Sequence, residues 1–114
     1  MLTVDALRGF GADVDEGLSR CMNNEAFYLR LVGMIPGDAG FQRLADALEQ
    51  GDLAAGFEAA HGLKGVLGNL ALTPLYQPVS EVTELLRPRT EANDYPARLA
   101  QILERRDQLH ALCE

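Results

Sequence analysis

Apolar residues recur every three or four positions along most of this chain, as in Phe27, Leu31 and Met34. This spacing places apolar side chains on one face of an α-helix, whereas a half-buried β-strand needs strict alternation. No stretch of four to eight residues shows that alternation together with an enrichment in β-branched residues. The pattern therefore predicts an all-α fold.

Capping and turn residues divide the first half of the chain into helical segments. Residues that favour helix N-termini precede three of them: Thr3 or Asp5, then Asp13, then Asn23 or Asn24. The Ile35–Pro36–Gly37 segment interrupts the third one. Residues 24–50 therefore form either one kinked helix or two.

The second half of the chain has clearer boundaries. Gly51–Asp52 is a helix stop followed by an N-cap, and it opens a helix over residues 52–70. Thr73 can cap the next helix, which Pro78 can kink. Asp94 begins a final helix after a polar loop. We expect one domain over residues 1–114, an antiparallel four-helix bundle with a short N-terminal helical element.

Composition excludes several functions. The net charge of −7 and the scattering of the ten basic residues argue against nucleic acid as a partner. No apolar run approaches the roughly 20 residues of a membrane span, and no signal peptide is evident, so we expect a cytoplasmic protein. Cys21 and Cys113 have no CxxC partner, and we interpret them as reduced thiols without a metal or other cofactor.

The helix predicted over residues 52–70 is unusually rich in glycine. It contains Gly56, Gly62, Gly65 and Gly68. Each glycine in a helix interior lowers helix stability by about 0.8–1.0 kcal/mol relative to alanine. The four glycines together therefore lower it by about 3–4 kcal/mol. That is a large share of a total stability of about 5–15 kcal/mol. These glycines therefore need a packing or functional reason.

A helical wheel separates this helix into two faces. An apolar stripe for the core consists of Ala59, Leu63, Val66, Leu67 and Leu70. The opposite face carries His61, and within about 60° of it lie Phe57, Glu58, Lys64, Gly65 and Gly68. His61 is therefore predicted to point away from the core, while Gly56 falls on the core side and allows close helix packing.

The neighbours of His61 suit a histidine that accepts a phosphoryl group. A neutral imidazole is nucleophilic, and Lys64 places a cation near enough to hold a phosphate oxygen. Gly65 leaves the approach to the ring unblocked, and the apolar Phe57 is expected to be covered by a partner. Glu58 can orient the imidazole through its second nitrogen. No metal ligands accompany these residues, so any Mg²⁺ has to come from the partner.

Residues 60–65, Ala-His-Gly-Leu-Lys-Gly, continue into Val66–Leu70 and resemble the AHxLKG motif of the histidine phosphotransfer (HPt) domain family. The preceding stretch, residues 48–53, is similar to the usual lead-in of that motif. In a helix that follows a Gly-Asp break, this motif is fairly specific.

The resemblance extends over about residues 13–87. Residues 17–22 and 27–31 look like the first bundle segments of the family. The chain departs from the family at Ala71, where many members have glycine, and the prolines at 74 and 78 are unusual for the helix that follows.

The resemblance implies that His61 is the phosphoryl acceptor, that Lys64 stabilises the phosphoryl group, and that Gly65 and Gly68 leave room for a receiver domain. Phe57 and Glu58 are further candidate contacts for that domain. The implied function is transfer of a phosphoryl group between receiver-domain aspartates of a hybrid kinase and a response regulator. Such a protein is a carrier rather than an enzyme, needs no cofactor, and works as a monomer.

Three other interpretations have less support. A non-catalytic adaptor of the same fold would bind receiver domains without phosphorylation. A family member that had lost phosphotransfer would, however, be expected to have lost the histidine, and His61 is present. A domain cut from a larger histidine kinase is disfavoured by the initial methionine and the terminal helix. A hydrolase is disfavoured because neither paired carboxylates nor a Ser/His/Asp pattern is present. The second histidine, His110, is interpreted as an ordinary surface residue.

Overall fold

A computed structural model describes all 114 residues and contains helices but no β-strand. The prediction of an all-α fold is confirmed. The helices are α1 (Val4–Phe10), α2 (Val14–Arg20), α3 (Glu25–Gly33), the short 3₁₀ helix η1 (Ile35–Gly37), α4 (Ala39–Gln50), α5 (Leu53–Asn69), α6 (Thr73–Leu86) and α7 (Tyr95–Cys113).

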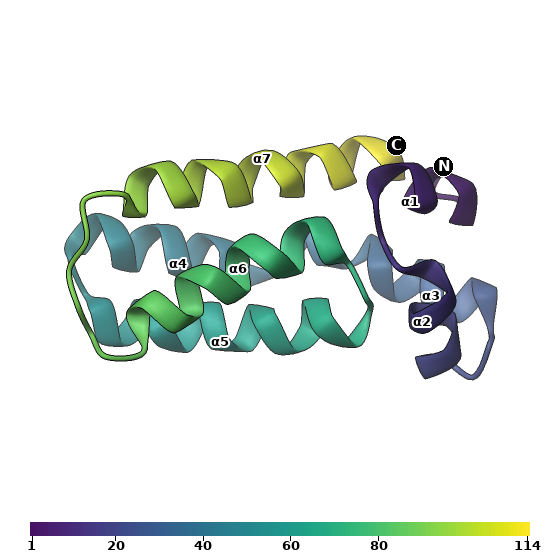
Figure 1. The fold of residues 1–114 in the computed structure, drawn as a ribbon. Helices are drawn as coiled ribbons and strands as arrows, with labels where there is room; N and C mark the ends of the chain where they lie inside the picture. The colour runs from purple at the N-terminus through teal and green to yellow at the C-terminus, as the bar shows by residue number, and fades with distance from the viewer.

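Helices α4 to α7 form an antiparallel four-helix bundle, as predicted (Figure 1). Helix α5 packs against both α4 and α6, and α7 closes the bundle by packing on α6 and α4. The core is apolar and includes fully buried Phe41, Leu44, Leu67, Val82 and Ile102. None of the helices combines the length and apolar composition needed to cross a membrane.

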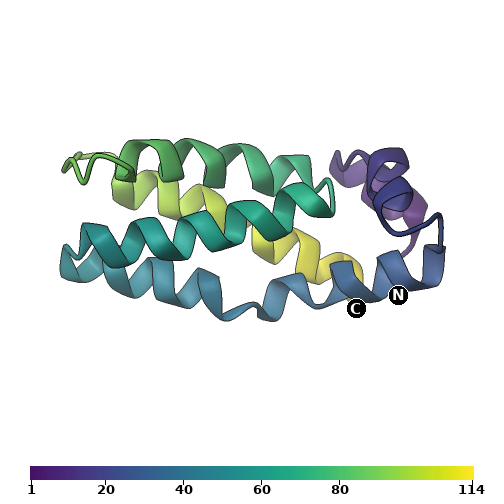
Figure 2. The ribbon, with the colours of Figure 1, turned by 90° about the horizontal axis from the view of Figure 1, so that it is seen from below.

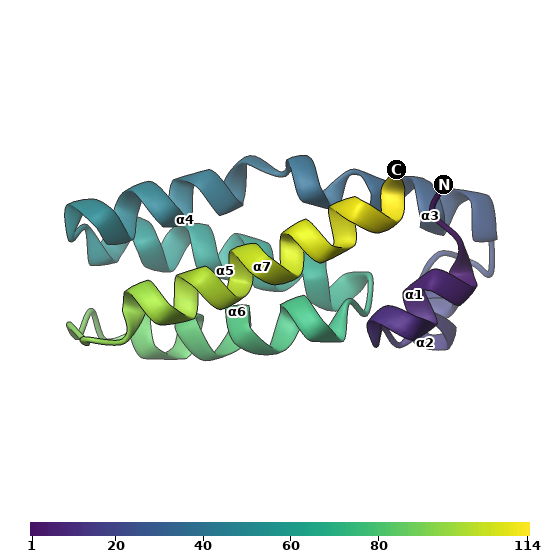
Figure 3. The same cartoon turned by 90° about the horizontal axis from the view of Figure 1, so that it is seen from above.

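Helices α1 to α3 form the N-terminal element, which lies at one end of the bundle near the C-terminus (Figures 1 and 3). Helix α3, η1 and α4 follow one another along one side of the molecule (Figure 2). The break at Ile35–Gly37 divides residues 24–50 into two helices. Asp38 then starts α4 as its N-cap, with Oδ1 accepting from the Gly40 N–H at 2.7 Å.

Most of the predicted helix starts are present. Each of four capping side chains accepts a hydrogen bond from the backbone N–H three residues on: Thr3 from Ala6, Asp13 from Glu16, Asn24 from Phe27 and Asp52 from Ala55. The prediction that Thr73 caps α6 is wrong. Helix α6 includes Thr73, and its N-cap is Leu72, which offers no side-chain hydrogen bond.

The tight turn between α5 and α6 accounts for that difference. Ala71 has a φ of +56° in the left-handed region, where glycine is favoured, and it brings the chain directly into α6. Glycine would adopt this conformation without the steric cost that the Ala71 side chain carries. Pro78 is buried inside α6, and the helix continues through it to Leu86.

The N-terminal element is fixed to the end of α5. Arg20 Nη1 donates to the Gly68 carbonyl, the Tyr28 hydroxyl donates to the Leu70 carbonyl at 2.9 Å, and the Asp13 N–H donates to the Ala71 carbonyl at 3.0 Å. The last carbonyls of a helix have no partner within it, so these bonds stabilise the end of α5.

The positions of α2 and α3 correct one expectation. Residues 17–22 and 27–31, which resemble first bundle segments, lie in and just after α2 and in α3, and neither helix is one of the four bundle helices. The buried Gly17 of α2 packs against the ring of Tyr28 in α3 instead. The first bundle helix is α4, which supplies the buried residues Phe41, Leu44 and Ala47.

Gly17→Ala is expected to lower the free energy of unfolding by about 1–3 kcal/mol, because overpacking a filled core has that cost. A Cβ atom on Gly17 would lie 2.5–2.7 Å from the Tyr28 ring and hydroxyl. The ring is fully buried and its hydroxyl is hydrogen-bonded, so it has little freedom to move. Urea unfolding measures the change. Helix propensity alone predicts that Gly17→Ala raises the free energy of unfolding. A variant more stable than wild type would therefore contradict the packing argument.

Tyr28→Phe is expected to remove a pH dependence as well as a hydrogen bond. Burial, together with the nearby Cys21 and Asp13, raises the pKa of Tyr28 from 10.0 to about 12. The folded chain therefore keeps this proton above pH 10 while the unfolded chain loses it, and stability falls between pH 10 and about 12. At pH 8 the variant is expected to be less stable by about 1–3 kcal/mol, because the Leu70 carbonyl loses its donor.

Urea unfolding at pH 8 and at pH 11 in both proteins tests this expectation. Burial also raises the pKa of Tyr95, and that contribution is common to both proteins. The difference between them therefore reports Tyr28 alone. An equal loss of stability on going to pH 11 in the two proteins would contradict the assignment.

Candidate functional site

His61 is an exposed residue in the middle of α5. Gly51, with a φ of +72°, ends α4, and Asp52 starts α5 by accepting from the Ala55 N–H at 3.0 Å. The helix then buries Gly56, Ala60, Leu63 and Leu67 against the bundle. His61 follows directly on Ala60 and faces solvent, as the helical wheel predicts.

The core stripe of α5 differs from the prediction at Ala59, which is only half-buried, and at two further residues. Val66, which was expected in the core, is 40% exposed, and the fully buried Ala60 takes part in the core instead. The wheel gives the angle between side chains but does not show which flank the neighbouring helices cover. Here α6 and α4 cover the flank that contains Ala60.

The imidazole of His61 stacks on the ring of Phe57, one turn earlier in α5. The ring centroids are 5.5 Å apart and the planes differ by 18°. Phe57 is half-buried, and the guanidinium carbons of Arg89 and Arg87 lie 4.6 and 5.1 Å from its centroid. Residues at and just after the end of α6 therefore already cover part of Phe57, and coverage of the rest by a partner stays a prediction. The stack restricts the orientation of the imidazole.

Lys64 lies one turn after His61 and is drawn towards α6. Its Nζ is 3.6 Å from Glu84 Oε2, and Arg87 contacts both carboxylate oxygens of Glu84 at 2.9 and 3.2 Å. The hydrogen bond from Arg87 and the two positive charges lower the pKa of the Glu84 carboxyl. Lys64 is the only lysine in the chain. Its ammonium group is thus held close to the His61 face by a carboxylate that Arg87 shares.

The glycines around His61 differ in their surroundings. A Cβ atom on Gly62 or Gly65 would have no neighbour within 4 Å, so both positions are open. A Cβ atom on Gly68 would lie 2.9 Å from Cε1 of Tyr76, a residue of α6. Gly68 therefore makes room for the Tyr76 ring of this chain. It also lines the hollow beside His61, and its contact with a receiver domain stays a prediction.

Glu58 lies on the other flank of His61 from Lys64. It lines a hollow between α4 and α5 together with Arg43 and Asp46, and it makes no hydrogen bond with the imidazole. The structure therefore does not bring together the Glu58–His61 pair that the spacing suggested.

A hollow of about 380 Å³ lies beside His61. It is lined from α5 by His61, Lys64, Gly65, Gly68 and Asn69, from α2 by Arg20, and from α6 by Tyr76. Sequence reasoning did not identify Arg20, Asn69 or Tyr76. Arg20 is 41 positions before His61 in the chain, and no local spacing connects the two residues.

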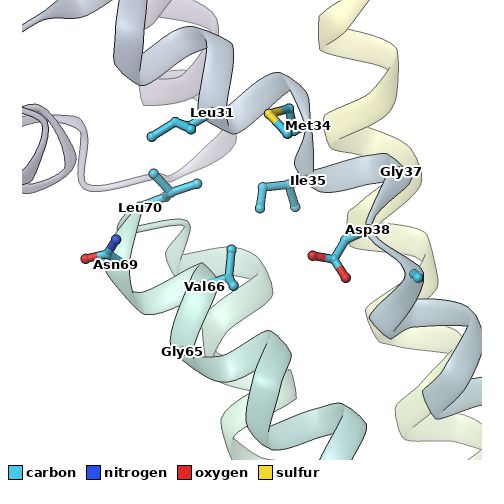
Figure 4. A pocket seen from close by; sticks show the side chains of 10 residues that line it. Leu31, Met34, Ile35, Gly37, Asp38, Gly65, Val66, Asn69 and Leu70 are labelled. Atoms are coloured by element: carbon cyan, nitrogen blue, oxygen red, sulfur yellow. The ribbon is translucent and has the colours of Figure 1, made fainter.

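An apolar groove of about 640 Å³ adjoins the same part of α5 (Figure 4). Leu31, Met34 and Ile35 form one wall, and they face Val66 of α5 and Leu70, the C-cap of that helix. Gly65 and Asn69 line both this groove and the hollow at His61. Met34 is 66% exposed, so the groove presents apolar side chains to solvent next to the histidine.

The cysteines and the second histidine lie away from the hollow at His61. Cys21 is buried and Cys113 is half-buried, and both are free thiols. No group of three or more His, Cys, Asp or Glu side chains is arranged to hold a metal ion. His110 lies near the end of α7, 3.6 Å from a carboxylate oxygen of Glu114.

Fold and site together define a helical bundle that presents one histidine on its surface, with a lysine one turn on and an open glycine beside it. Residues 38–114, more than half of the chain, match the family model of the Hpt domain, and the chain belongs to this family. Hpt domains are phosphocarriers that interact with receiver domains, which gives the chain a phosphotransfer role in two-component signalling. No curated protein and no solved structure shows a significant match.

The family match begins at Asp38, the N-cap of α4. It therefore contains the four bundle helices and leaves out α1, α2, α3 and η1. His61, Lys64 and Gly65 lie within the match, whereas Arg20 lies outside it.

Proposed function

We propose that this chain carries a phosphoryl group on His61 between the aspartates of two receiver domains. The observation that supports this most strongly is the exposed imidazole itself, stacked on Phe57 and placed one turn before Lys64 within the family match. In this proposal residues 1–114 act as one domain and as a monomer, and the chain is a reactant rather than an enzyme.

The transfer step is a displacement at phosphorus. The unprotonated ring nitrogen of His61 attacks the phosphorus of an aspartyl phosphate, the bond from phosphorus to the aspartate oxygen breaks, and the aspartate leaves as a carboxylate. The other ring nitrogen keeps its proton. Transfer to a second receiver is the same step in reverse, with a new aspartate as the nucleophile.

Three neighbouring residues have defined parts in this proposal. Phe57 holds the ring in an orientation that exposes its reactive edge. Lys64 exchanges its contact with Glu84, at 3.6 Å, for a phosphoryl oxygen that carries more negative charge. Gly65 lets the receiver approach closely, because it has no side chain and no atom lies within 4 Å of the position that its Cβ would take.

The receiver domain is proposed to dock over α5, with Phe57, Glu58, Gly65 and Gly68 in or at the edge of its footprint. The apolar groove formed by Leu31, Met34, Ile35, Val66 and Leu70 continues this face. Apolar side chains exposed beside a reactive group are typical of a surface that a partner covers. The two sides of Gly65 thus offer charge on one flank and apolar area on the other.

The proposal is tested by incubating the purified chain with receiver domains phosphorylated by acetyl phosphate. Label that is lost in acid and kept in alkali is the expected product on this chain, because a phosphoramidate bond has that stability. A receiver that binds the chain but leaves it unlabelled, even after prolonged incubation, would contradict the carrier function. That result would favour an adaptor of the same fold.

A further inference from the structure

Arg20 brings a second cation to the hollow beside His61. It is the last residue of α2, and its side chain lines this hollow together with His61 and Lys64. Its guanidinium Nη1 donates to the Gly68 carbonyl, and its Nε donates to Glu16 Oε1 at 3.0 Å. A guanidinium has five N–H donors, so these two contacts leave three free.

The charge of this hollow is opposite to that of the chain as a whole. The chain has a net charge of −7, yet the seven residues that line the hollow include two cations and no carboxylate. Lys64 already shares Glu84 with Arg87. Arg20 is likewise paired, with Glu16 at 3.0 Å, and it approaches the hollow from the other end of α5.

The surrounding structure holds Arg20 in this place. Tyr28 and Asp13 fasten the N-terminal element to the Leu70 and Ala71 carbonyls, just beyond the carbonyl that Arg20 contacts. The side chain remains 43% exposed, so it is anchored without being buried. Such a guanidinium can turn towards an anion without a change in the fold.

We propose that Arg20 is a second cationic residue of the phosphotransfer site, which stabilises the phosphoryl group while it passes between the receiver aspartate and His61. This inference rests on the proposed function. Gly68 lies seven residues after His61, or about 10 Å along the helix axis, so Arg20 acts from the C-terminal side of α5. The N-terminal element, which lies outside the family match, thereby becomes part of the site.

The size of the effect follows from the charges. A guanidinium attracts a phosphoryl group of charge near −2 across a partly hydrated distance, which corresponds to about a tenfold change in rate. The attraction is screened by salt, so the effect is expected to shrink as ionic strength rises.

The test compares the rate of transfer from a phosphorylated receiver domain in three variants. Arg20→Gln keeps a donor for the Gly68 carbonyl but loses the charge, and it is expected to be about tenfold slower at low salt. Arg20→Lys keeps the charge and is expected to stay near the wild-type rate. Arg8→Ala is the matched control, since Arg8 also lies in the N-terminal element and pairs with an exposed carboxylate, that of Asp15, at 3.0 Å.

Each outcome supports or overturns the proposed role of Arg20. An Arg20→Gln rate equal to wild type, or one that 0.5 M NaCl does not bring closer to wild type, would overturn the role of the charge. An equal loss in Arg8→Ala would point to general damage to the N-terminal element and overturn it too. If wild type takes up label and Arg20→Gln does so equally fast, only this inference fails. If wild type takes up none from any receiver, the proposed function fails with it.

Discussion

Replacing His61 with glutamine is expected to abolish phosphate uptake from phosphorylated receiver domains. Glutamine is polar and of similar reach, but its amide nitrogen is not a nucleophile and forms no stable bond to phosphorus. His61 is exposed, and surface substitutions usually change stability by less than about 0.5 kcal/mol. The variant should therefore fold as wild type does, and a complete loss of acid-labile label should come from chemistry alone.

The chain offers a matched control, because it contains only one other histidine. His110 is also exposed and on a helix, but its nearest charged partner is Glu114, at 3.6 Å, and it has no lysine or open glycine one turn away. His110→Gln is expected to keep the full rate of uptake. Acid-labile label that persists in His61→Gln and disappears in His110→Gln would place the acceptor on α7 and contradict the assignment.

Features set by neighbouring residues could be predicted from the sequence. The N-caps Thr3, Asp13, Asn24 and Asp52 form as expected, because each needs only a side-chain oxygen and an N–H three residues on. The outward position of His61 follows in the same way from the period of a single helix. Family membership follows from a motif that is continuous in the chain.

Features that depend on which helices become neighbours could not be predicted in this way. Val66 is exposed because the groove between α3 and α5 is open at that point, and periodicity contains no information about that groove. Gly68 leaves space for the ring of Tyr76, which belongs to another helix. Arg20 reaches the His61 hollow only because α2 is fastened to the end of α5. In each case the decisive contact joins separate helices.

Two glycines of α5, Gly62 and Gly65, have open surroundings, and comparing them distinguishes what folding requires from what function requires. Neither Gly62 nor Gly65 meets any atom at the position of a Cβ, so nothing within the chain requires glycine there. Either could be alanine with a gain of about 0.8–1.0 kcal/mol in helix stability. Gly65 lines both the His61 hollow and the apolar groove, whereas Gly62 lines neither. Close approach of a partner therefore explains Gly65 but leaves Gly62 without a structural reason.

Gly65→Gln is expected to slow phosphotransfer from a receiver domain by about 100-fold, because a misplacement of 1 Å in such a complex can cost that much. The same variant is expected to unfold at higher urea concentration than wild type, since glutamine is a much better helix former than glycine. Quenched-flow transfer and urea unfolding measure the two effects. A loss of function together with a gain in stability cannot be attributed to a damaged fold.

Gly62→Gln supplies the control on the same helix, with the same expected gain in stability and a transfer rate near that of wild type. Labelling by phosphoramidate, a donor small enough to need no docking surface, should proceed alike in all three proteins, because His61 itself is unchanged. A slow reaction of Gly65→Gln with phosphoramidate would mean that the side chain blocks the imidazole directly. A Gly65→Gln variant that takes phosphate from a receiver as fast as wild type would show that the receiver does not approach over this turn of α5, and the docking face would have to be placed elsewhere.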